Sequence, residues 1–428
     1  MSTTTTSTAS ILPRQSRRAR PARLQPSLFQ RWAKTAIDRR LEGLVGGRVR
    51  VHDDAGAREF GDGRGKVIEV RVRSPRLYAR LAREGSLGAG TSWIEGDWEC
   101  NDLPALLRLL VAQPGFVGPS GRLDSFLARG ESALRTLASP LTKNTRGGSR
   151  RNISAHYDLG NDFYAAMLDP SMTYSSGIFS FPDEPLESAQ TEKYDRLCRQ
   201  LDLRPSHRLL EIGTGWGGFA LHAAKHYGCH VTTTTISAEQ RALALERVEA
   251  AGLSDRIDVR FDDYRDLTGR YDRLVSIEMI EAVGAEYLDR FVQVCSDRLE
   301  PDGVMGLQAI VIADQLYERS KRHVDFIKRY VFPGGFLPSV AAISDRVARV
   351  SDFRIQDVHD ITADYAETLR RWRANLDESP EAYASVDDSG AFERLWAYYL
   401  AYCEAGFEER RIGCVQMTLT KSGWRPGR

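Results

Sequence analysis

The sequence has few cysteines and lacks any apolar run long enough to cross a bilayer. Its six cysteines form no Cys-x-x-Cys pair, and they are Cys100, Cys198, Cys229, Cys295, Cys403 and Cys414. This spacing indicates the reduced thiols of a cytoplasmic protein and argues against a zinc site or a disulfide framework. We therefore expect neither a bound metal nor a transmembrane helix.

The sequence also lacks an excess of either charge, since the formal net charge at pH 7 is +1. Such a balance gives no general attraction to nucleic acid. Residues 1–25 are an exception, because they hold several arginines and no acidic residue. This segment is either a solvated, disordered tail or an arm attracted to anionic lipid. The pair Arg17-Arg18 is followed by no apolar segment, which argues against an export signal.

Changes in composition divide the chain into a tail, two domains and a basic linker. The predicted boundaries are 1–25 for the tail, 26–130 for an N-terminal domain, 131–151 for the linker and 152–428 for a larger C-terminal domain. In the N-terminal domain, residues 47–53 and 65–74 alternate like strands, and residues 75–85 have the spacing of a helix. Asn101 or Asp102 can cap a further helix that follows two tryptophans.

The C-terminal domain alternates strand and helix patterns. Strands are predicted at residues 208–212, 229–236, 256–261, 271–280 and 303–312. Helices are predicted between them at residues 218–228, 238–252 and 288–299. This alternation predicts a Rossmann-like α/β fold, in which helices cover both faces of a parallel sheet.

The segment LLEIGTGWGG, residues 209–218, places a carboxylate and several glycines at the end of the first of these strands. The glycines allow a ligand to approach the backbone closely, but their order does not fit the dinucleotide fingerprint and no P-loop lysine follows. Glu211 needs a partner if it is buried, and a ligand ammonium group would supply one. An amino acid joined to a nucleoside without phosphates describes S-adenosylmethionine. The alternative is a tight structural turn.

Together with this segment, six further segments match the pattern of one known family in order, and they are residues 90–100, 152–179, 261–284, 330–339, 360–372 and 398–407. Together they resemble the cyclopropane-fatty-acyl-phospholipid synthases and the mycolic acid cyclopropane synthases. The resemblance implies a class I methyltransferase sheet with a helical lid insertion and a smaller N-terminal α/β domain. It covers most of the chain except the tail.

The resemblance implies that S-adenosylmethionine binds at the carboxyl ends of the strands. The residues assigned to it are Tyr174, Ser175, Glu211, Gly213, Gly215, Gly217, Thr235, Ser237, Gln240, Asp263 and Tyr264. Glu211 and the glycines would hold its amino-acid part, Ser237 and Gln240 its ribose, and Asp263 and Tyr264 its adenine. Ser237 is equally suited to cap the helix that follows it.

The family transfers a methyl group to a cis double bond, and a bound bicarbonate is thought to accept the proton that closes the ring. Glu281 and Tyr365 match the glutamate and tyrosine of its cage. Ser176 stands where the family usually has a cysteine, and Gln308 where it has a histidine. Cys403 matches a further cysteine once proposed as catalytic, although a small buried hydrophobe is the other interpretation.

These two replacements leave the product open between a cyclopropane and a methyl- or methylene-branched chain. A small-amine N-methyltransferase and a catalytically silent binding module are further alternatives. Residues 313–350 are predicted to form the wall and lid of an acyl tunnel, or else a plain core insertion. The expected partners are membrane phospholipid and an anionic membrane surface, reached peripherally from the cytoplasm, with a possible homodimer.

Overall fold

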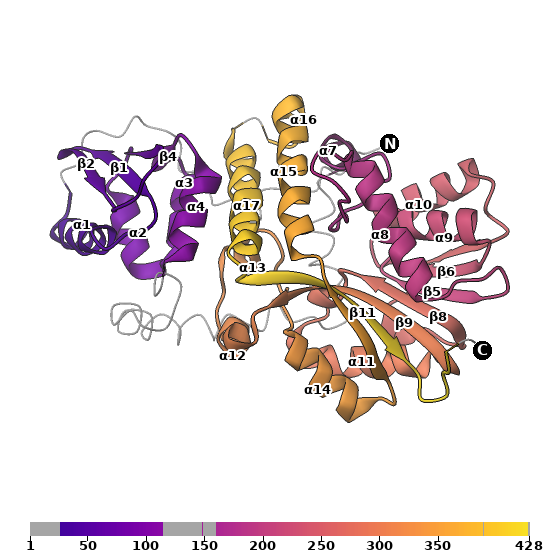
Figure 1. Cartoon of the computed structure of the whole chain (residues 1–428). Helices are drawn as coiled ribbons and strands as arrows, with labels where there is room; N and C mark the ends of the chain where they lie inside the picture. The colour runs from indigo at the N-terminus through magenta and orange to yellow at the C-terminus, as the bar shows by residue number, and fades with distance from the viewer. Residues whose placement is uncertain (1–25, 114–147, 149–159, 388, 427–428) are drawn as a thin grey trace. The chain divides into compact units, whose positions relative to one another are not determined.

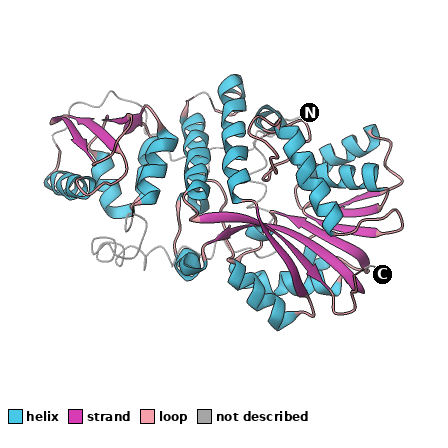
Figure 2. Cartoon of the chain, viewed as in Figure 1, coloured by secondary structure: helices cyan, strands magenta, loops and turns pink. Residues whose placement is uncertain are grey.

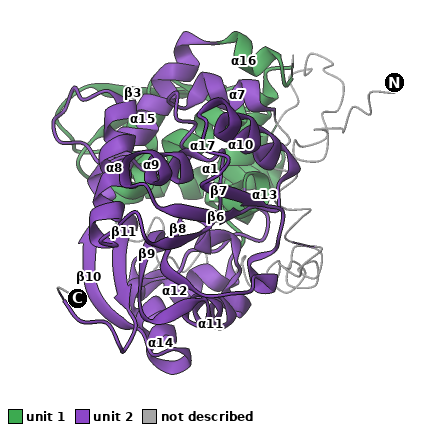
Figure 3. Cartoon of the chain, turned by 90° about the vertical axis from the view of Figure 1, so that its right-hand side faces the viewer, with its two compact units in different colours: residues 1–141, 324–331, 380–409 green, residues 142–323, 332–379, 410–428 purple. Residues whose placement is uncertain are grey.

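The computed structural model describes residues 26–113, 148, 160–387 and 389–426. The chain divides into two compact units (Figure 3). Unit 1 comprises residues 1–141, 324–331 and 380–409, and unit 2 comprises residues 142–323, 332–379 and 410–428. The predicted tail, and the predicted linker apart from Gly148, lie outside the described residues.

Unit 1 contains a four-stranded sheet in the order β2-β1-β3-β4. Its strands are β1 (Arg48–Asp53), β2 (Gly56–Phe60), β3 (Val67–Val72) and β4 (Trp98–Cys100). Strands β1 and β3 are parallel, and the other two pairs are antiparallel. Its helices are α1 (Leu28–Leu41), α2 (Arg76–Glu84), α3 (Ser86–Ile94), α4 (Leu103–Ala112), α13 (Phe326–Tyr330), α16 (Glu381–Ala384) and α17 (Ala391–Glu408).

Local sequence signals set the helix ends of unit 1. Ser27 and Gln30 form a capping box at the start of α1. Asp102 caps α4 by accepting a hydrogen bond from the Ala105 amide, as one of the two predicted capping residues. The two tryptophans that precede α4 lie in different elements, since Trp93 belongs to helix α3 and Trp98 to strand β4. Their rings pack edge-on against each other.

Unit 2 contains a seven-stranded sheet in the order β10-β11-β9-β8-β5-β6-β7 (Figures 1 and 2). Its strands are β5 (Arg208–Ile212), β6 (His230–Thr234), β7 (Ile257–Arg260), β8 (Tyr271–Ile277), β9 (Leu299–Ile312), β10 (Arg354–Asp360) and β11 (Ile412–Thr420). Strands β5 to β9 run parallel, which confirms the predicted parallel sheet. Strands β10 and β11 were not predicted from the sequence, and β11 runs antiparallel to both of its neighbours.

Alternate residues of the central strands enter different cores. Leu209 of β5 packs with helices α8 (Leu186–Gln200), α9 (Gly218–Tyr227) and α10 (Ala238–Ala250). Leu210 faces the opposite core, which includes helices α11 (Leu288–Asp297) and α14 (Val340–Val350). Figure 1 shows these two sets of helices on opposite sides of the sheet. Burial on both faces agrees with the apolar residues of the inner strands β5 and β8, whereas β7 alternates buried and exposed residues.

The remaining helices of unit 2 are α7 (Asn161–Met167), α12 (Asp314–Arg322), α15 (Thr362–Glu378), and the 3₁₀ turns η3 (Tyr264–Asp266), η4 (Ile280–Ala282) and η5 (Ala285–Tyr287). The predicted lid, residues 313–350, is divided, because residues 324–331 belong to unit 1 and the rest to unit 2. Helix α14 packs in the core of the sheet beside α11, and the lid role of this segment stays a prediction. The units also differ from the predicted domains, since residues 380–409 belong to unit 1. Among the described residues, no helix has the length and apolar content that a bilayer span requires.

Candidate active site

The carboxyl ends of five parallel strands meet at one edge of the unit 2 sheet. In open α/β sheets, ligands bind outside this edge. The glycine bend follows β5, residues 235–240 follow β6, residues 261–264 follow β7, and Glu278 to Glu281 follow β8. The topology therefore brings most of the predicted site residues to a single edge.

The bend after β5 depends on glycine backbone conformations and leaves space above Gly215. Gly213 and Gly215 have φ values of 103° and 53°, which only glycine adopts freely. The amides of Gly213 and Thr214 both donate to the carbonyl of Thr234, which ties the bend to the end of β6. A Cβ atom at Gly215 would meet no described atom within 4 Å, so space remains above this residue.

Glu211 is a buried carboxylate directly beneath this bend. It accepts a hydrogen bond of 2.6 Å from the Thr233 hydroxyl, and Thr233 also contacts Thr214. Burial raises the pKa of Glu211 to about 8, because few groups compensate its charge. A ligand ammonium group would stabilise the ionised form. These residues therefore fit the amino-acid part of S-adenosylmethionine.

The loops after β6 and β7 hold the residues predicted for the ribose and adenine. Ser237 caps helix α10 by accepting from the Gln240 amide, as its alternative interpretation requires, and the Thr235 hydroxyl donates to the Gln240 side chain. Asp263 is buried and forms an ion pair with Arg265. The Tyr264 hydroxyl is buried and has no hydrogen-bond partner among the described residues. Their contacts with a cofactor stay a prediction.

Ser175 contacts Lys193, a residue that was not among the predicted site residues. Its hydroxyl accepts a hydrogen bond of 2.6 Å from the ammonium of Lys193, a fully buried residue of α8. Burial lowers the pKa of Lys193 to about 7, although Glu278 and Asp169 partly offset this effect. Nothing in the local sequence indicates that this helical lysine is buried, because its burial results from tertiary packing alone.

A chain of aromatic rings runs through the same region of unit 2. Tyr164 packs against Trp216 of the glycine bend and against Tyr174, with ring centroids 4.9 and 5.5 Å apart. Tyr174 in turn packs against Trp372, and Trp372 packs edge-on against Tyr365. The faces of such rings attract cations. The rings connect the predicted cofactor bend with the predicted catalytic tyrosine.

Glu278 is the centre of the predicted catalytic residues, although it was not among them. Its Oε1 accepts from the Ser176 amide at 3.0 Å and from the Gln308 side chain at 2.7 Å. Its Oε2 accepts from the Tyr365 hydroxyl at 2.6 Å. Burial raises the pKa of Glu278, and these three hydrogen bonds oppose the shift. The structure thus brings Ser176, Gln308 and Tyr365 together around one carboxylate.

Glu281 lies three residues further along, in turn η4. Its Oε1 accepts from the Ile310 amide, while its Oε2 is out of contact with solvent and has no hydrogen-bond partner among the described residues. Burial and the nearby charge of Glu278 raise the pKa of Glu281 to about 8. At neutral pH it is therefore largely protonated and can donate from its unpartnered side.

Cys403 is the one predicted catalytic residue that lies in unit 1 rather than in unit 2. It belongs to helix α17, and burial raises the pKa of its thiol well above the usual range. A thiolate is therefore disfavoured there. This environment agrees with the small-hydrophobe interpretation, and a catalytic role stays a prediction.

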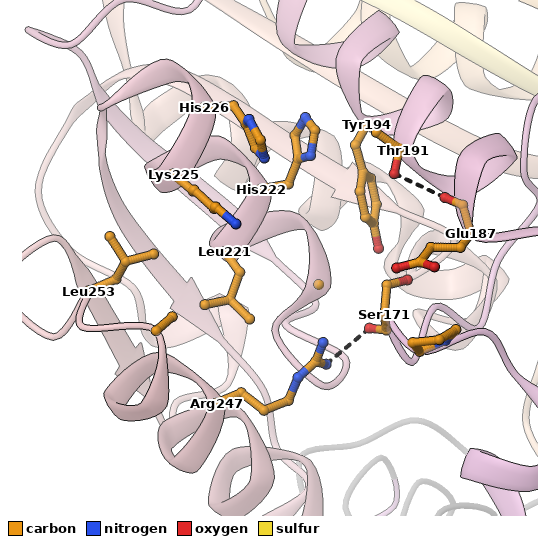
Figure 4. Close-up of a pocket in the computed structure, with 13 residues that line it drawn as sticks. Ser171, Glu187, Thr191, Tyr194, Leu221, His222, Lys225, His226, Arg247 and Leu253 are labelled. Atoms are coloured by element: carbon orange, nitrogen blue, oxygen red, sulfur yellow. Dashed lines mark hydrogen bonds between the residues drawn. The ribbon is translucent and has the colours of Figure 1, made fainter.

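A cavity of about 280 Å³ opens elsewhere in unit 2 (Figure 4). It is lined from helices α8, α9 and α10 and includes His222, Lys225 and Arg247. Arg247 donates to the carbonyls of Ser171 and Trp216, which links the loop between α7 and α8 to the turn before α9. None of the predicted site residues lines this cavity.

Comparison with known proteins agrees with this geometry. Residues 144–417 match the family described as mycolic acid cyclopropane synthetase. The chain is 36% identical over 384 residues to the tuberculostearic acid methyltransferase UfaA1 of Mycobacterium tuberculosis, covering 87% of each chain. It is also 36% identical over 358 residues to the cyclopropane-fatty-acyl-phospholipid synthase of Escherichia coli strain K12, covering 82% of this chain and 88% of that one.

A solved structure supports the same assignment. The mycolic acid cyclopropane synthase CmaA1, complexed with SAH and CTAB, is 31% identical, with a TM-score of 0.59, and the match covers 64% of this chain and 98% of CmaA1. The resemblance in sequence and the class I methyltransferase fold are thereby confirmed. The chain belongs to the cyclopropane synthase family of S-adenosylmethionine-dependent methyltransferases.

Proposed function

We propose that the chain transfers a methyl group from S-adenosylmethionine to the cis double bond of an unsaturated phospholipid acyl chain, giving a cyclopropane fatty acid. The observation that carries this proposal is that two buried carboxylates, those of Glu278 and Glu281, lie at the sheet edge where the packed aromatic rings end at Tyr365. S-adenosylmethionine supplies an electrophilic methyl group when bound. The chain's own residues would position it, exclude water and manage the resulting charge and proton.

Each part of the site has a task in this reaction. Glu211 and the glycine bend would hold the amino-acid part of the cofactor. The faces of Tyr174 and Trp372 would stabilise the cation that forms on the acyl chain, since aromatic quadrupoles attract cations. The unpartnered Oε2 of Glu281 would contact the substrate side of the site. A site closed to water protects such a cation from capture.

A second candidate product is a methyl- or methylene-branched acyl chain. The observation in its favour is that Ser176 and Gln308 replace the cysteine and histidine that the resemblance gives to ring-forming enzymes. Neither residue performs acid–base chemistry near neutral pH. After a hydride shift, loss of a proton from the added carbon would give a methylene branch in place of the ring.

We further propose that the enzyme works at the inner face of the membrane as a peripheral, cytoplasmic protein. Helix α1 exposes Leu28 and Trp32, which are 84% and 47% accessible. Arg31 and Arg39 are exposed on the same helix. Apolar and basic residues together suit docking to an anionic lipid surface. A homodimer, which the resemblance implies, stays a prediction that light scattering of the purified protein checks.

Vesicle binding tests the membrane proposal. Trp32→Ala should weaken cosedimentation with phosphatidylglycerol vesicles several-fold, because an interfacial tryptophan contributes apolar contact area. Thr35→Ala is the matched control, since Thr35 is exposed one turn away on the same helix and offers little apolar area. Equal binding of both variants and the unmodified protein would remove α1 from the docking surface.

Lipid analysis tests the proposed reaction. The chain should be expressed in a host that lacks its own enzyme of this kind and is rich in monounsaturated phospholipid. Mass spectrometry should then show acyl chains one methylene group heavier, and proton NMR should show cyclopropane signals upfield of the chain methylenes. Acyl chains that are heavier but lack the cyclopropane signals would indicate the branched product. An unchanged lipid pool would contradict the proposal.

A further inference from the structure

Glu278 has a backbone conformation that glutamate rarely adopts. It is the first residue after strand β8, and its φ of 48° lies in the left-handed region. A side chain with a Cβ atom is strained there, whereas glycine is not. Such strain gathers at functional sites, where the surrounding structure enforces it. A glutamate held at this position therefore indicates a role for its carboxylate.

The carboxylate of Glu278 is held by donors from separate elements, and the Cys414 thiol of strand β11 also donates to its Oε1, at 3.6 Å. The Ser176 amide comes from the loop before α8, Gln308 from strand β9 and Tyr365 from helix α15. The Glu278 amide also donates to the carbonyl of Gln308, at 2.8 Å, which fixes the turn against β9. Hydrogen bonds of this kind favour the ionised form of a carboxylate. This arrangement is a built anion site that the protein fills with its own side chain.

A bound bicarbonate does not fit this arrangement. The resemblance assigns the anion's cage to the positions of Ser176, Glu281, Gln308 and Tyr365. Three of these residues already donate to Glu278. A second anion would meet the Glu278 carboxylate at close range without the donors that the cage needs. Like charges in a low-dielectric site repel strongly.

We propose that the Glu278 carboxylate replaces bicarbonate in this enzyme and is the group that accepts the proton from the methylated acyl chain. The proposal rests on the proposed function, because that function supplies the cation that must lose a proton. The proposal holds for a cyclopropane and for a methylene branch, since both form when the added carbon loses a proton.

The reaction proceeds by methyl transfer, followed by ring closure and transfer of a proton to Glu278. The electron pair of the double bond forms the new C–C bond as the C–S bond of the methyl donor breaks, which leaves a cation on the acyl chain. A C–H bond of the added carbon then breaks, and its electron pair closes the ring. The proton goes to Oε2 of Glu278, which accepts one hydrogen bond, from Tyr365, and keeps a second lone pair. It leaves to solvent when the product departs.

Turnover with and without bicarbonate tests this proposal. Methyl transfer to monounsaturated phospholipid vesicles should be measured with the full chain in buffer freed of carbon dioxide, and again with added bicarbonate. We expect the same rate in both buffers. Glu278→Gln should lose roughly 100-fold or more of the rate, because it removes the base and keeps the side-chain shape. Glu286→Gln, on an exposed glutamate in the neighbouring turn η5, should keep the rate.

Binding of ¹³C-labelled bicarbonate, followed by NMR, gives a readout independent of turnover. The unmodified chain should not bind it, whereas Glu278→Gly should, since glycine relieves the strained backbone and empties the cage. Bicarbonate should then restore part of the turnover of Glu278→Gly. Bicarbonate binding by the unmodified chain, or full activity of Glu278→Gln, would overturn the proposal. An unmodified chain that never methylates lipid would refute the proposed function, while the binding comparison would still decide the role of Glu278.

Discussion

Strands β5 and β8 are each followed by a residue with a positive φ, but the two residue types differ. Gly213 follows β5 with a φ of 103°, and Glu278 follows β8 with a φ of 48°. Two residues after Gly213, Gly215 leaves open space, and the carboxylate of Glu211 has few partners. Glu278 brings in a side chain that takes up the surrounding donors. We therefore propose that the end of β5 receives the cofactor, whereas the end of β8 supplies a reactive group of its own.

This difference separates two tasks at one sheet edge. Residues after β5 should determine how tightly the cofactor binds, whereas residues after β8 should determine how fast the chemistry proceeds. Substitutions at the two strand ends should therefore change different kinetic constants. Three experiments test that separation, beginning with the largest expected effect.

Glu281→Gln should abolish turnover while leaving cofactor affinity nearly intact. The glutamine can still accept from the Ile310 amide, but it loses the unpartnered, ionisable oxygen. Loss of a group that handles protons typically costs 100- to 10,000-fold in rate, and we expect a fall of roughly this size in kcat. Initial rates on lipid vesicles, with calorimetric titration of S-adenosylmethionine, measure both quantities. An unchanged rate would remove Glu281 from the catalytic residues.

Gly215→Val should show the opposite behaviour. A β-branched residue is strained at a φ of 53°, and its side chain would occupy the space above the bend. Affinity for S-adenosylmethionine should fall about 10-fold or more, by roughly 1.4 kcal/mol. Gly252→Val is the control, since Gly252 has a φ of 67° and lies beyond helix α10. If both variants bind the cofactor equally well, the bend is only a structural turn.

Cofactor binding should release a proton from Glu211. With a pKa of about 8, this carboxyl is mostly protonated at pH 7 in the free protein. An ammonium group beside it would lower that pKa, so roughly nine-tenths of a proton should leave at pH 7 and very little at pH 9. Calorimetry in two buffers of different ionisation enthalpy measures this number. Glu211→Gln should remove the pH dependence, and its persistence in that variant would assign the proton to another group.

The sequence predicted the residues that depend on local pattern. Glu211, the glycine bend and the Ser237 cap follow from strand, turn and helix signals within a few residues of each other. The five parallel strands were predictable for the same reason, since apolar residues as in β5 or β-branched residues as in β6 mark them locally. Strand β10 was missed because most of its residues are exposed. Strand β11 has a buried apolar pattern that a strand search of residues 412–420 would have found.

The sequence could not reveal what long-range packing creates. Glu278 stands in the same SIEMIEAVG segment as Glu281, but its role depends on Gln308 and Tyr365, which are 30 and 87 residues away. Lys193 is likewise an ordinary helix residue until the fold buries it against Ser175. A charged residue directly after an apolar strand is the one local signal that could have singled out Glu278.

Transfer of a ¹³C-methyl label from S-adenosylmethionine to defined vesicles tests the central claim most directly. The purified chain should be incubated with vesicles of a cis-monounsaturated phospholipid, and the extracted lipid examined by carbon NMR. The account predicts the label on the acyl chain, in a ring carbon, at the former double bond. Label that remains on the cofactor, or that reaches only an added amine substrate and never the lipid, would contradict it.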